Sequence, residues 1–149
     1  MDLNPQLTSP TEVRALLNQL GHRPNRGLGQ NYLIDANILD GIVQLAALES
    51  TDCVLEIGPG LGALTERILV QTMHLRCIEK DSTMAGYLRG RFPGLEVMEA
   101  DAMDVNLNAI FASGVNKVVA NLPYSVASRL MVEIAEGADG PRGGEEGGV

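Results

Sequence analysis

Several residue types are scarce in this 149-residue chain, and each scarcity excludes a class of protein. The chain has two cysteines, no tryptophan and only 3% aromatic residues. Two cysteines cannot make a disulfide framework, and Cys53 and Cys77 with His22 and His74 lack the close spacing of a zinc site, so we expect no metal. Because both cysteines lie in apolar, strand-like runs, we expect them to be reduced and buried.

Long apolar runs are also missing. No run approaches the roughly 20 residues that a helix needs to span a bilayer. The first ten residues, MDLNPQLTSP, lack the basic and apolar segments of a secretory signal. The sequence therefore predicts a cytoplasmic protein without a membrane partner.

Positive charge is in short supply as well. Eleven basic side chains against nineteen acidic ones give a formal net charge of −8 at pH 7, which argues against a chain that mainly coats polyanions. Residues 131–149 hold one basic and five acidic side chains, whereas residues 1–30 hold three basic and two acidic ones. Half of the net acidity therefore belongs to the last nineteen residues.

What the chain does have is an alternation of apolar strands and amphipathic helices, with 45% hydrophobic residues, enough for one buried core. Apolar periodicity and capping residues predict helices at about 10–20, 36–48, 63–70, 82–89 and 125–136, and strands at 53–57, 75–79, 95–98 and 116–120. In the second helix we expect Ile38, Ile42 and Leu45 to share one face. The alternation predicts an α/β fold, a parallel sheet with helices on both faces.

Composition changes sharply near residue 137. Residues 137–149 hold six glycines, one proline and almost nothing apolar, which cannot build a core. We therefore expect a partial domain over residues 1–136, followed by a Gly-rich tail over 137–149 that is disordered or foreign to the fold.

A glycine-rich turn, Gly58-Pro59-Gly60-Leu61-Gly62, follows the first predicted strand. Glycines let the backbone turn tightly and approach a ligand at the amino end of the next helix, as in nucleotide-binding sites. Taken alone, the spacing of Gly58, Gly60 and Ala63 also matches a dinucleotide fingerprint. The turn predicts a nucleotide-like ligand, and the neighbouring residues must identify it.

Acidic residues stand at the carboxyl ends of three predicted strands. Glu56 would repel a pyrophosphate but suits the ammonium and sulfonium groups of S-adenosylmethionine. Glu79 could accept the hydroxyl hydrogens of a ribose, which fits NAD and S-adenosylmethionine equally. Asp101 could accept hydrogen from an adenine amine. The alternative interpretation is that Glu56 and Asp101 merely cap helices or turns.

The segment Asn121-Leu122-Pro123-Tyr124 follows the fourth predicted strand, where ligand sites of open α/β sheets gather. An amide oxygen and a backbone carbonyl could hold the N–H bonds of an exocyclic amine, so that its nitrogen lone pair faces a methyl donor without a strong base. Tyr124 could stack on a base that has left its helix. The alternative is an ordinary Asn-Pro turn with a packed tyrosine.

Together these features resemble the amino-terminal part of the rRNA adenine N6,N6-dimethyltransferase family, which includes small-subunit rRNA dimethylases and macrolide-resistance large-subunit methylases. Four segments carry the resemblance, in the family's order and spacing: Leu28–Leu33, Glu56–Thr65, Ile78–Asp81 with Asp101-Ala102, and Asn121–Tyr124. The resemblance implies a Rossmann-like class I S-adenosylmethionine methyltransferase fold. Since such a sheet has seven strands, we expect a fold truncated after its fourth strand.

The resemblance also assigns residues to the cofactor, S-adenosyl-L-methionine, and to the reaction. The implied cofactor-binding residues are Gln30, Asn31, Leu33, Glu56, Gly58, Gly60, Glu79, Lys80, Asp101, Ala102 and Asn121. The implied catalytic residues are Asn121, Leu122, Pro123 and Tyr124. Among them, Asn121 and Leu122 would engage the target amine and Tyr124 would stack on the flipped adenine.

The activity that the resemblance implies is dimethylation of the exocyclic amine of adenine in rRNA, foremost the 16S rRNA of the small ribosomal subunit, during ribosome maturation. It implies rRNA and the small subunit as partners and a cytoplasmic monomer. Three alternatives stay open: a large-subunit rRNA adenine methylase, a truncated and inactive fragment that binds cofactor, and an NAD-binding oxidoreductase.

Overall fold

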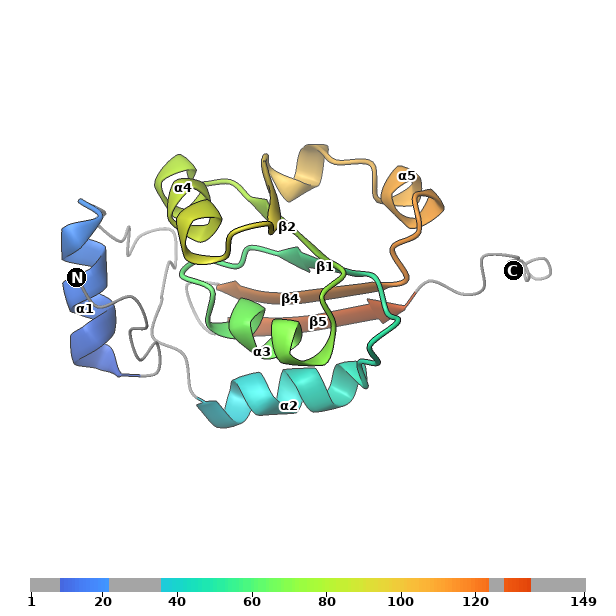
Figure 1. Ribbon diagram of the computed structural model, residues 1–149, viewed down its shortest axis with the longest axis horizontal. Helices are drawn as coiled ribbons and strands as arrows, with labels where there is room; N and C mark the ends of the chain where they lie inside the picture. Colours follow the sequence, from blue (N-terminus) through green and yellow to red (C-terminus); the bar gives the residue numbers. More distant parts are fainter. Residues whose placement is uncertain (1–8, 22–35, 124–127, 135–149) are drawn as a thin grey trace.

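The computed structural model describes residues 9–21, 36–123 and 128–134, and its centre is one five-stranded sheet (Figure 1). The strand order is β3-β2-β1-β4-β5. The strands are β1 (Val54–Ile57), β2 (Leu75–Glu79), β3 (Glu96–Glu99), β4 (Lys117–Pro123) and β5 (Ser128–Ile134). β1 to β4 run parallel, which confirms the predicted α/β class and its four parallel strands.

Helices cover both faces of the sheet. The helices are α1 (Pro10–Gln19), α2 (Ala36–Ala46), α3 (Ala63–Gln71), α4 (Ser82–Arg91), α5 (Leu107–Ala112) and the short 3-10 helix η2 (Ala102–Asp104). Helices α1 to α4 share one buried cluster, whereas η2 and α5 pack on the second cluster across the sheet. Figure 1 shows α5 on the side of the sheet away from α2 and α3.

Local sequence signals explain how α1 begins. Ser9 is extended and its hydroxyl accepts a hydrogen bond from the N–H of Glu12, as a helix cap should. Val13, Leu16 and Leu17 follow at helical spacing and are all buried. The predicted start and apolar face of this helix are confirmed.

The predicted face of α2 was right at Ile42 but wrong at Ile38 and Leu45. The structure buries Leu39, Ile42 and Ala46, whereas Ile38 is 44% exposed and Leu45 is 67% exposed. Consecutive residues of a helix point about 100° apart, so Ile38 and Leu45 point away from the core that their neighbours Leu39 and Ala46 face. The stripe with spacing of three and four residues that starts at Leu39 is the one that meets the core.

The helix predicted over residues 125–136 was also wrong, because residues Ser128–Ile134 form β5, antiparallel to β4. Alternate apolar residues at Leu130, Val132 and Ile134 fit a strand as well as a helix, and β-branched residues favour the strand. The edge of β4 offers unpaired N–H and C=O groups, and β5 pairs with them from Lys117 to Pro123. The sheet therefore has one strand more than the sequence predicted.

Two short elements were missed by the sequence analysis. Asp101 caps η2 through the N–H of Met103, and Asn106 caps α5 through the N–H of Ala109. Both residue types are good helix caps, so the signal was present, but the helices of three and six residues are too short to show a clear period.

The cysteines are free thiols, as predicted. Cys77 is buried on β2, but Cys53 is only half-buried, just before β1. In the part of the chain that the structure describes, no helix is long and apolar enough to cross a membrane.

Candidate functional site

The carboxyl ends of the four parallel strands meet at one edge of the sheet. Ile57 of β1 is level with Ile78 of β2 and with Ala120 of β4, and Glu79 of β2 is level with Glu99 of β3. The residues that follow these positions therefore lie along the same edge. They include the glycine turn, Asp101 and the backbone of Asn121, which is where open α/β sheets bind ligands.

The glycine turn is built from backbone conformations that other residues rarely adopt. Gly58, Gly60 and Gly62 have φ angles of +69°, +58° and +91°. The N–H of Gly58 donates to Ile78 at 2.9 Å, which fixes the start of the turn beside β2. The turn ends at the first residue of α3, so the positive end of the helix dipole points to this edge.

Gly62 is also required by packing. A Cβ atom at this position would lie 2.7 Å from Cε2 of Phe92 and 3.3 Å from Cδ2 of Leu88. Leu88 lies in the last turn of α4 and Phe92 directly follows this helix, so the absence of a side chain at Gly62 lets the start of α3 approach the end of α4 closely. The sequence predicts Gly62 as part of the turn, whereas its packing role depends on Leu88 and Phe92, about thirty residues farther along the chain.

The carboxylate of Glu79 joins the glycine turn to the β2–α4 turn. Its Oε1 accepts a hydrogen bond from the N–H of Gly60 at 3.0 Å, and its Oε2 accepts from the N–H of Asp81 at 2.9 Å. Burial raises the pKa of Glu79, while these two N–H groups act in the opposite direction. A carboxylate has about four lone-pair sites, and the backbone donors use only some of them, so Glu79 is oriented and can still accept further hydrogen bonds.

Asp101 lies beside it, after β3. Its Oδ1 accepts from the N–H of Met103 at 2.9 Å, and its Oδ2 lies 3.4 Å from Nζ of Lys80. The hydrogen bond from Met103 and the Lys80 ammonium lower the pKa of Asp101 and keep it ionised at neutral pH. Asp101 therefore does cap a helix, as the alternative interpretation predicted. Its side chain is also 35% exposed, so Oδ2 remains accessible to a ligand. Ala102 packs partly buried next to it.

Glu56 is placed differently from what its chemistry suggested. Its side chain is 1% exposed and lies between β1 and α3, where Oε1 accepts from Oγ1 of Thr65 at 2.6 Å and lies 3.7 Å from Sγ of Cys77. Burial raises the pKa of Glu56 to about 7, despite the hydrogen bonds from Thr65 and Cys77. Burial and the nearby Glu56 carboxylate also raise the pKa of Cys77. In the described residues, this carboxylate therefore braces α3 against the sheet.

Thr65 was not singled out from the sequence. It stands in the first turn of α3, nine residues after Glu56, and the buried Thr65–Glu56 hydrogen bond closes the strand–turn–helix unit. Its polar side chain in an otherwise apolar stretch, Ala63-Leu64-Thr65, is the signal that could have found it.

Part of the expected site lies outside the described residues. Gln30, Asn31, Leu33 and Tyr124 lie outside the described residues. The backbone of Asn121, Leu122 and Pro123 forms the last three positions of β4, one register step beyond Ala120 at the carboxyl edge. The structure thus puts the start of this segment next to the glycine turn.

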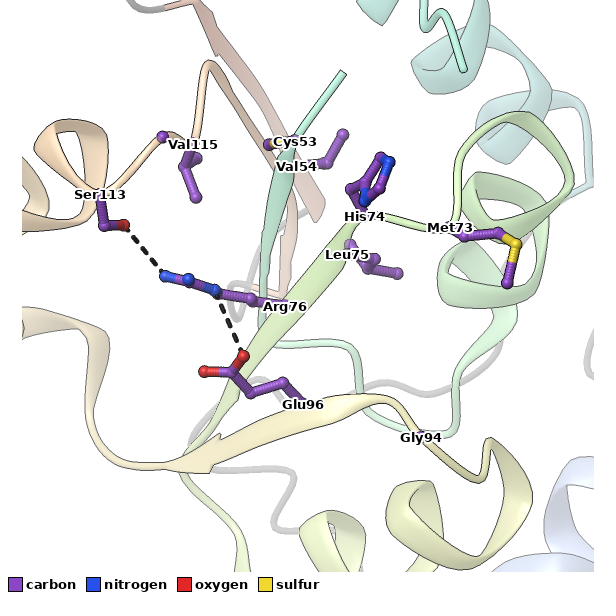
Figure 2. Close-up of a pocket in the computed structure, with 11 residues that line it drawn as sticks. Cys53, Val54, Met73, His74, Leu75, Arg76, Gly94, Glu96, Ser113 and Val115 are labelled. Atoms are coloured by element: carbon purple, nitrogen blue, oxygen red, sulfur yellow. Dashed lines mark hydrogen bonds and ion pairs between the residues drawn. The ribbon is translucent and has the colours of Figure 1, made fainter. Parts of the chain in front are cut away.

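A separate hollow of about 270 Å³ lies at the opposite, amino-terminal edge of the sheet (Figure 2). Figure 2 shows Arg76 stretched across it, with Nη1 3.1 Å from Oγ of Ser113 and Nε 3.4 Å from Glu96. Cys53 and His74 also line it, but none of the expected site residues does. Among the described residues, no three His, Cys, Asp or Glu side chains are grouped to hold a metal.

The arrangement at the carboxyl edge agrees with a family comparison. A family model described as ribosomal RNA adenine dimethylase matches residues 21–144. The chain belongs to this family. The match covers the glycine turn, Glu79, Asp101 and the Asn121–Tyr124 segment within one alignment.

Curated relatives point the same way. The ribosomal RNA small subunit methyltransferase A of Opitutus terrae is 43% identical over 128 residues, which are 80% of this chain and 46% of that protein. The protein with the same name from Alkaliphilus oremlandii is 34% identical over 138 residues, 88% of this chain and 48% of that protein. The chain thus spans about half the length of the curated relatives it matches.

A solved structure supports the fold. A protein of Pyrococcus horikoshii that is proposed to be an RNA methyltransferase superposes with a TM-score of 0.54 at 24% identity, covering 74% of this chain and 57% of that one. At this identity the likeness concerns the fold alone, and it agrees with the expected Rossmann-like methyltransferase sheet.

Proposed function

We propose that this chain binds S-adenosyl-L-methionine at the carboxyl edge of its sheet, and that the protein dimethylates the exocyclic amine of adenine in rRNA. The 16S rRNA of the small subunit is the proposed target, because the matched relatives of Opitutus terrae and Alkaliphilus oremlandii are named small subunit methyltransferases. The observation that carries the proposal is the convergence of the glycine turn, Glu79 and Asp101 from three adjacent strands.

The residues at this edge fit the cofactor. Gly58 and Gly60 leave room for its methionine and ribose portions, since neither carries a side chain. Glu79 is oriented by two backbone N–H groups and retains lone pairs for the ribose hydroxyls. Asp101 is ionised and partly exposed, so it can accept a hydrogen bond from the adenine amine. Ala102 would lie beside the adenine ring. The bound cofactor would supply a methyl group carried on a sulfonium.

The amine-holding residues complete the proposal. Asn121 and Leu122 would hold the target nitrogen, with Pro123 shaping the turn and Tyr124 stacking on the flipped adenine. Support comes from the position of Asn121 at the end of β4, directly beside β1 and its glycine turn. Gln30, Asn31 and Leu33 are proposed to contact the cofactor, as are Glu56 and Lys80, although the burial of Glu56 argues for an indirect role.

Other features of the protein follow from this activity. We propose rRNA and the small ribosomal subunit as partners and the cytoplasm as the location, since that is where ribosomal RNA is modified in a bacterium such as the named relatives. We also propose that residues 1–136 form a partial methyltransferase domain and that residues 137–149 form a Gly-rich tail of different composition.

The proposal is tested by binding and by methyl transfer. S-adenosylhomocysteine, S-adenosylmethionine and NADH are titrated separately into the folded chain, and heat is expected only with the first two. Transfer of labelled methyl groups to small-subunit rRNA is then measured for this chain and for the full-length Opitutus terrae relative. Binding of NADH alone would replace the proposal with a dinucleotide enzyme, and binding without transfer by the chain would leave it a cofactor-binding unit.

A further inference from the structure

Lys80 and Asp101 form an ion pair at the edge where the cofactor is proposed to bind. Lys80 directly follows β2 and Asp101 lies two residues beyond β3, and these two strands are neighbours in the sheet. The N–H of Ala100 donates to the carbonyl of Glu79 at 3.0 Å, so the pairing of the two segments continues to the residues next to the ion pair. The backbone segments that carry Lys80 and Asp101 are therefore hydrogen-bonded to each other next to the ion pair.

The two oxygens of Asp101 are engaged in different ways. Oδ1 caps η2 through Met103 and is needed to hold the local backbone. Oδ2 lies 3.4 Å from Nζ of Lys80, and no backbone N–H of the described residues donates to it. Since the Lys80 side chain is 77% exposed, its ammonium group can move away at small cost, and Oδ2 is the oxygen that a ligand can reach.

An adenine amine and an ammonium group are both hydrogen donors, so each competes with the other for the same carboxylate oxygen. We propose that Lys80 determines how this site reads the 6-position of the cofactor's purine ring. Its ammonium group holds Oδ2 of Asp101 until the adenine amine takes its place. This inference rests on the proposed function and adds to it a residue that opposes binding of adenine.

The same geometry makes a second purine informative. S-inosylhomocysteine carries a carbonyl oxygen in place of the 6-amino group, and this acceptor would face a carboxylate with the wrong polarity. Lys80, whose Nζ lies 3.4 Å from Oδ2 of Asp101, would donate to that oxygen instead. The lysine therefore weakens the preference for adenine over hypoxanthine. Its removal should increase that preference in two ways, by strengthening binding of the adenine compound and by weakening binding of the hypoxanthine compound.

The chain contains a matched control on the same two strands. Arg76 and Glu96 also join β2 to β3 at 3.4 Å, but at the opposite edge of the sheet (Figure 2). Replacing Arg76 removes one positive charge and one ion pair of the same length without touching the carboxyl edge. A variant at this position separates a local effect on Asp101 from a change in net charge.

The experiment is a calorimetric titration of S-adenosylhomocysteine and of S-inosylhomocysteine into the full chain and its Lys80→Met and Arg76→Met variants. Lys80→Met is expected to bind S-adenosylhomocysteine about two- to fivefold more tightly, because the ion pair that competes with the adenine amine is exposed and therefore weak. The same variant is expected to bind S-inosylhomocysteine more weakly than the unmodified chain does. Arg76→Met is expected to bind both as the unmodified chain does. Added salt should tighten binding of the adenine compound to the unmodified chain but not to Lys80→Met, because salt screens the competing pair.

Two results would overturn the inference. Equal weakening of both compounds by Lys80→Met would make the lysine a packing residue. Unchanged binding of both compounds would make the ion pair irrelevant to the ligand. Absence of any heat with S-adenosylhomocysteine in the unmodified chain is a different outcome, since it removes the proposed function itself and the inference with it. A Lys80→Gln variant guards against an effect of the methionine side chain.

Discussion

Oε1 of Glu79 accepts a hydrogen bond from the N–H of Gly60 at 3.0 Å, nineteen residues away in the chain. The same carboxylate, through Oε2, holds the N–H of Asp81. One buried side chain therefore fixes the glycine turn and the β2–α4 turn at a set separation, and it does so at the edge where the cofactor is proposed to bind.

The first prediction concerns this residue. Glu79→Ala is expected to raise the dissociation constant of S-adenosylhomocysteine by about 10- to 100-fold, because a charged acceptor for the ribose and an anchor of the turn are both lost. The dissociation constant of Glu79→Gln should lie between those of the unmodified chain and Glu79→Ala, since the amide oxygen can accept from only one of the two N–H groups. The measurement is calorimetry on chains whose folding is checked by circular dichroism.

Glu99→Gln provides the control for that series. Glu99 is level with Glu79 on the neighbouring strand β3 but is exposed to solvent. Its replacement should leave the dissociation constant unchanged. Equal losses in the Glu79 and Glu99 variants would contradict the assignment.

The second prediction uses the raised pKa of Glu56. Because burial brings this pKa to about 7 in the folded chain, the folded state binds a proton more tightly than the unfolded state, whose carboxyl titrates near 4.5. The contribution of Glu56 to the free energy of unfolding should therefore be fully present below about pH 4.5, and it should be lost as the pH rises towards 7.

Glu56→Gln is expected to remove that dependence. We compare the free energy of unfolding of this variant with that of the unmodified chain at each pH. The difference, variant minus unmodified chain, should be larger at pH 8 than at pH 5 by on the order of 2 kcal/mol. A constant effect of the amide on stability cancels in this comparison. Urea unfolding at the two pH values measures this difference. The exposed Glu99→Gln variant serves again as control, and an equal pH response in both variants would show that Glu56 is not the group responsible.

The third prediction concerns Lys117. Its ammonium group lies 2.9 Å from Oδ2 of Asp52 and also donates to the carbonyls of Ala46 and Ala47, at the end of α2. Lys117→Met should lower the free energy of unfolding by about 2 kcal/mol or more, because the buried carbonyl of Ala46 loses this donor and the buried Asp52 carboxylate loses its cationic partner. The exposed Lys80→Met variant should lose less than about 0.5 kcal/mol in the same urea measurement.

Asp52 gives this cluster a dependence on acid. Burial opposes ionisation, but hydrogen bonds from Asn116 and Lys117 outweigh it and lower the pKa of Asp52. A group with a lowered folded pKa contributes stability above its unfolded pKa, near 4, and loses it as the pH falls through the folded pKa. Asp52→Asn should flatten the acid side of the unfolding profile, and an unchanged profile would contradict this role.

The fourth prediction concerns Gly62. Gly62→Ala should destabilise the chain by about 1–3 kcal/mol, because the new methyl group meets the Phe92 ring and the φ angle of +91° suits glycine. Gly86→Ala, in the middle of α4 with open space at the Cβ position, should be neutral or slightly stabilising. Thermal unfolding of both variants decides the point, and similar midpoints would show that the contact with Phe92 is easily relieved.

The fifth prediction separates chemistry from binding. In the full-length Opitutus terrae relative, an alanine at the position that aligns with Asn121 is expected to abolish methyl transfer while cofactor affinity stays nearly the same. Normal turnover at saturating cofactor, with weaker binding, would assign this residue to the cofactor instead.

Much of the site could be predicted from the chain alone, because its residues are local. The glycine turn needs only its own backbone, and Glu79 and Asp101 stand just after short apolar runs that read as strands. Parallel strands then bring their carboxyl ends to one edge, so the order of segments was enough to place these groups together. The family resemblance added the cofactor and the reaction.

Contacts between distant segments decided the rest. Glu56 carries a carboxyl group that suits a cationic ligand, yet packing of α3 against the sheet buries it beside Thr65. The local sequence marks Thr65 as a polar residue in an apolar stretch, but it does not show which group Thr65 meets. Residues 128–134 fit a helix or a strand, and only the free hydrogen-bonding edge of β4 selected the strand. The sequence by itself determined which groups reach the edge of the sheet. The tertiary structure determined which carboxylates are buried, capped or left open, because burial and pairing depend on neighbours far along the chain.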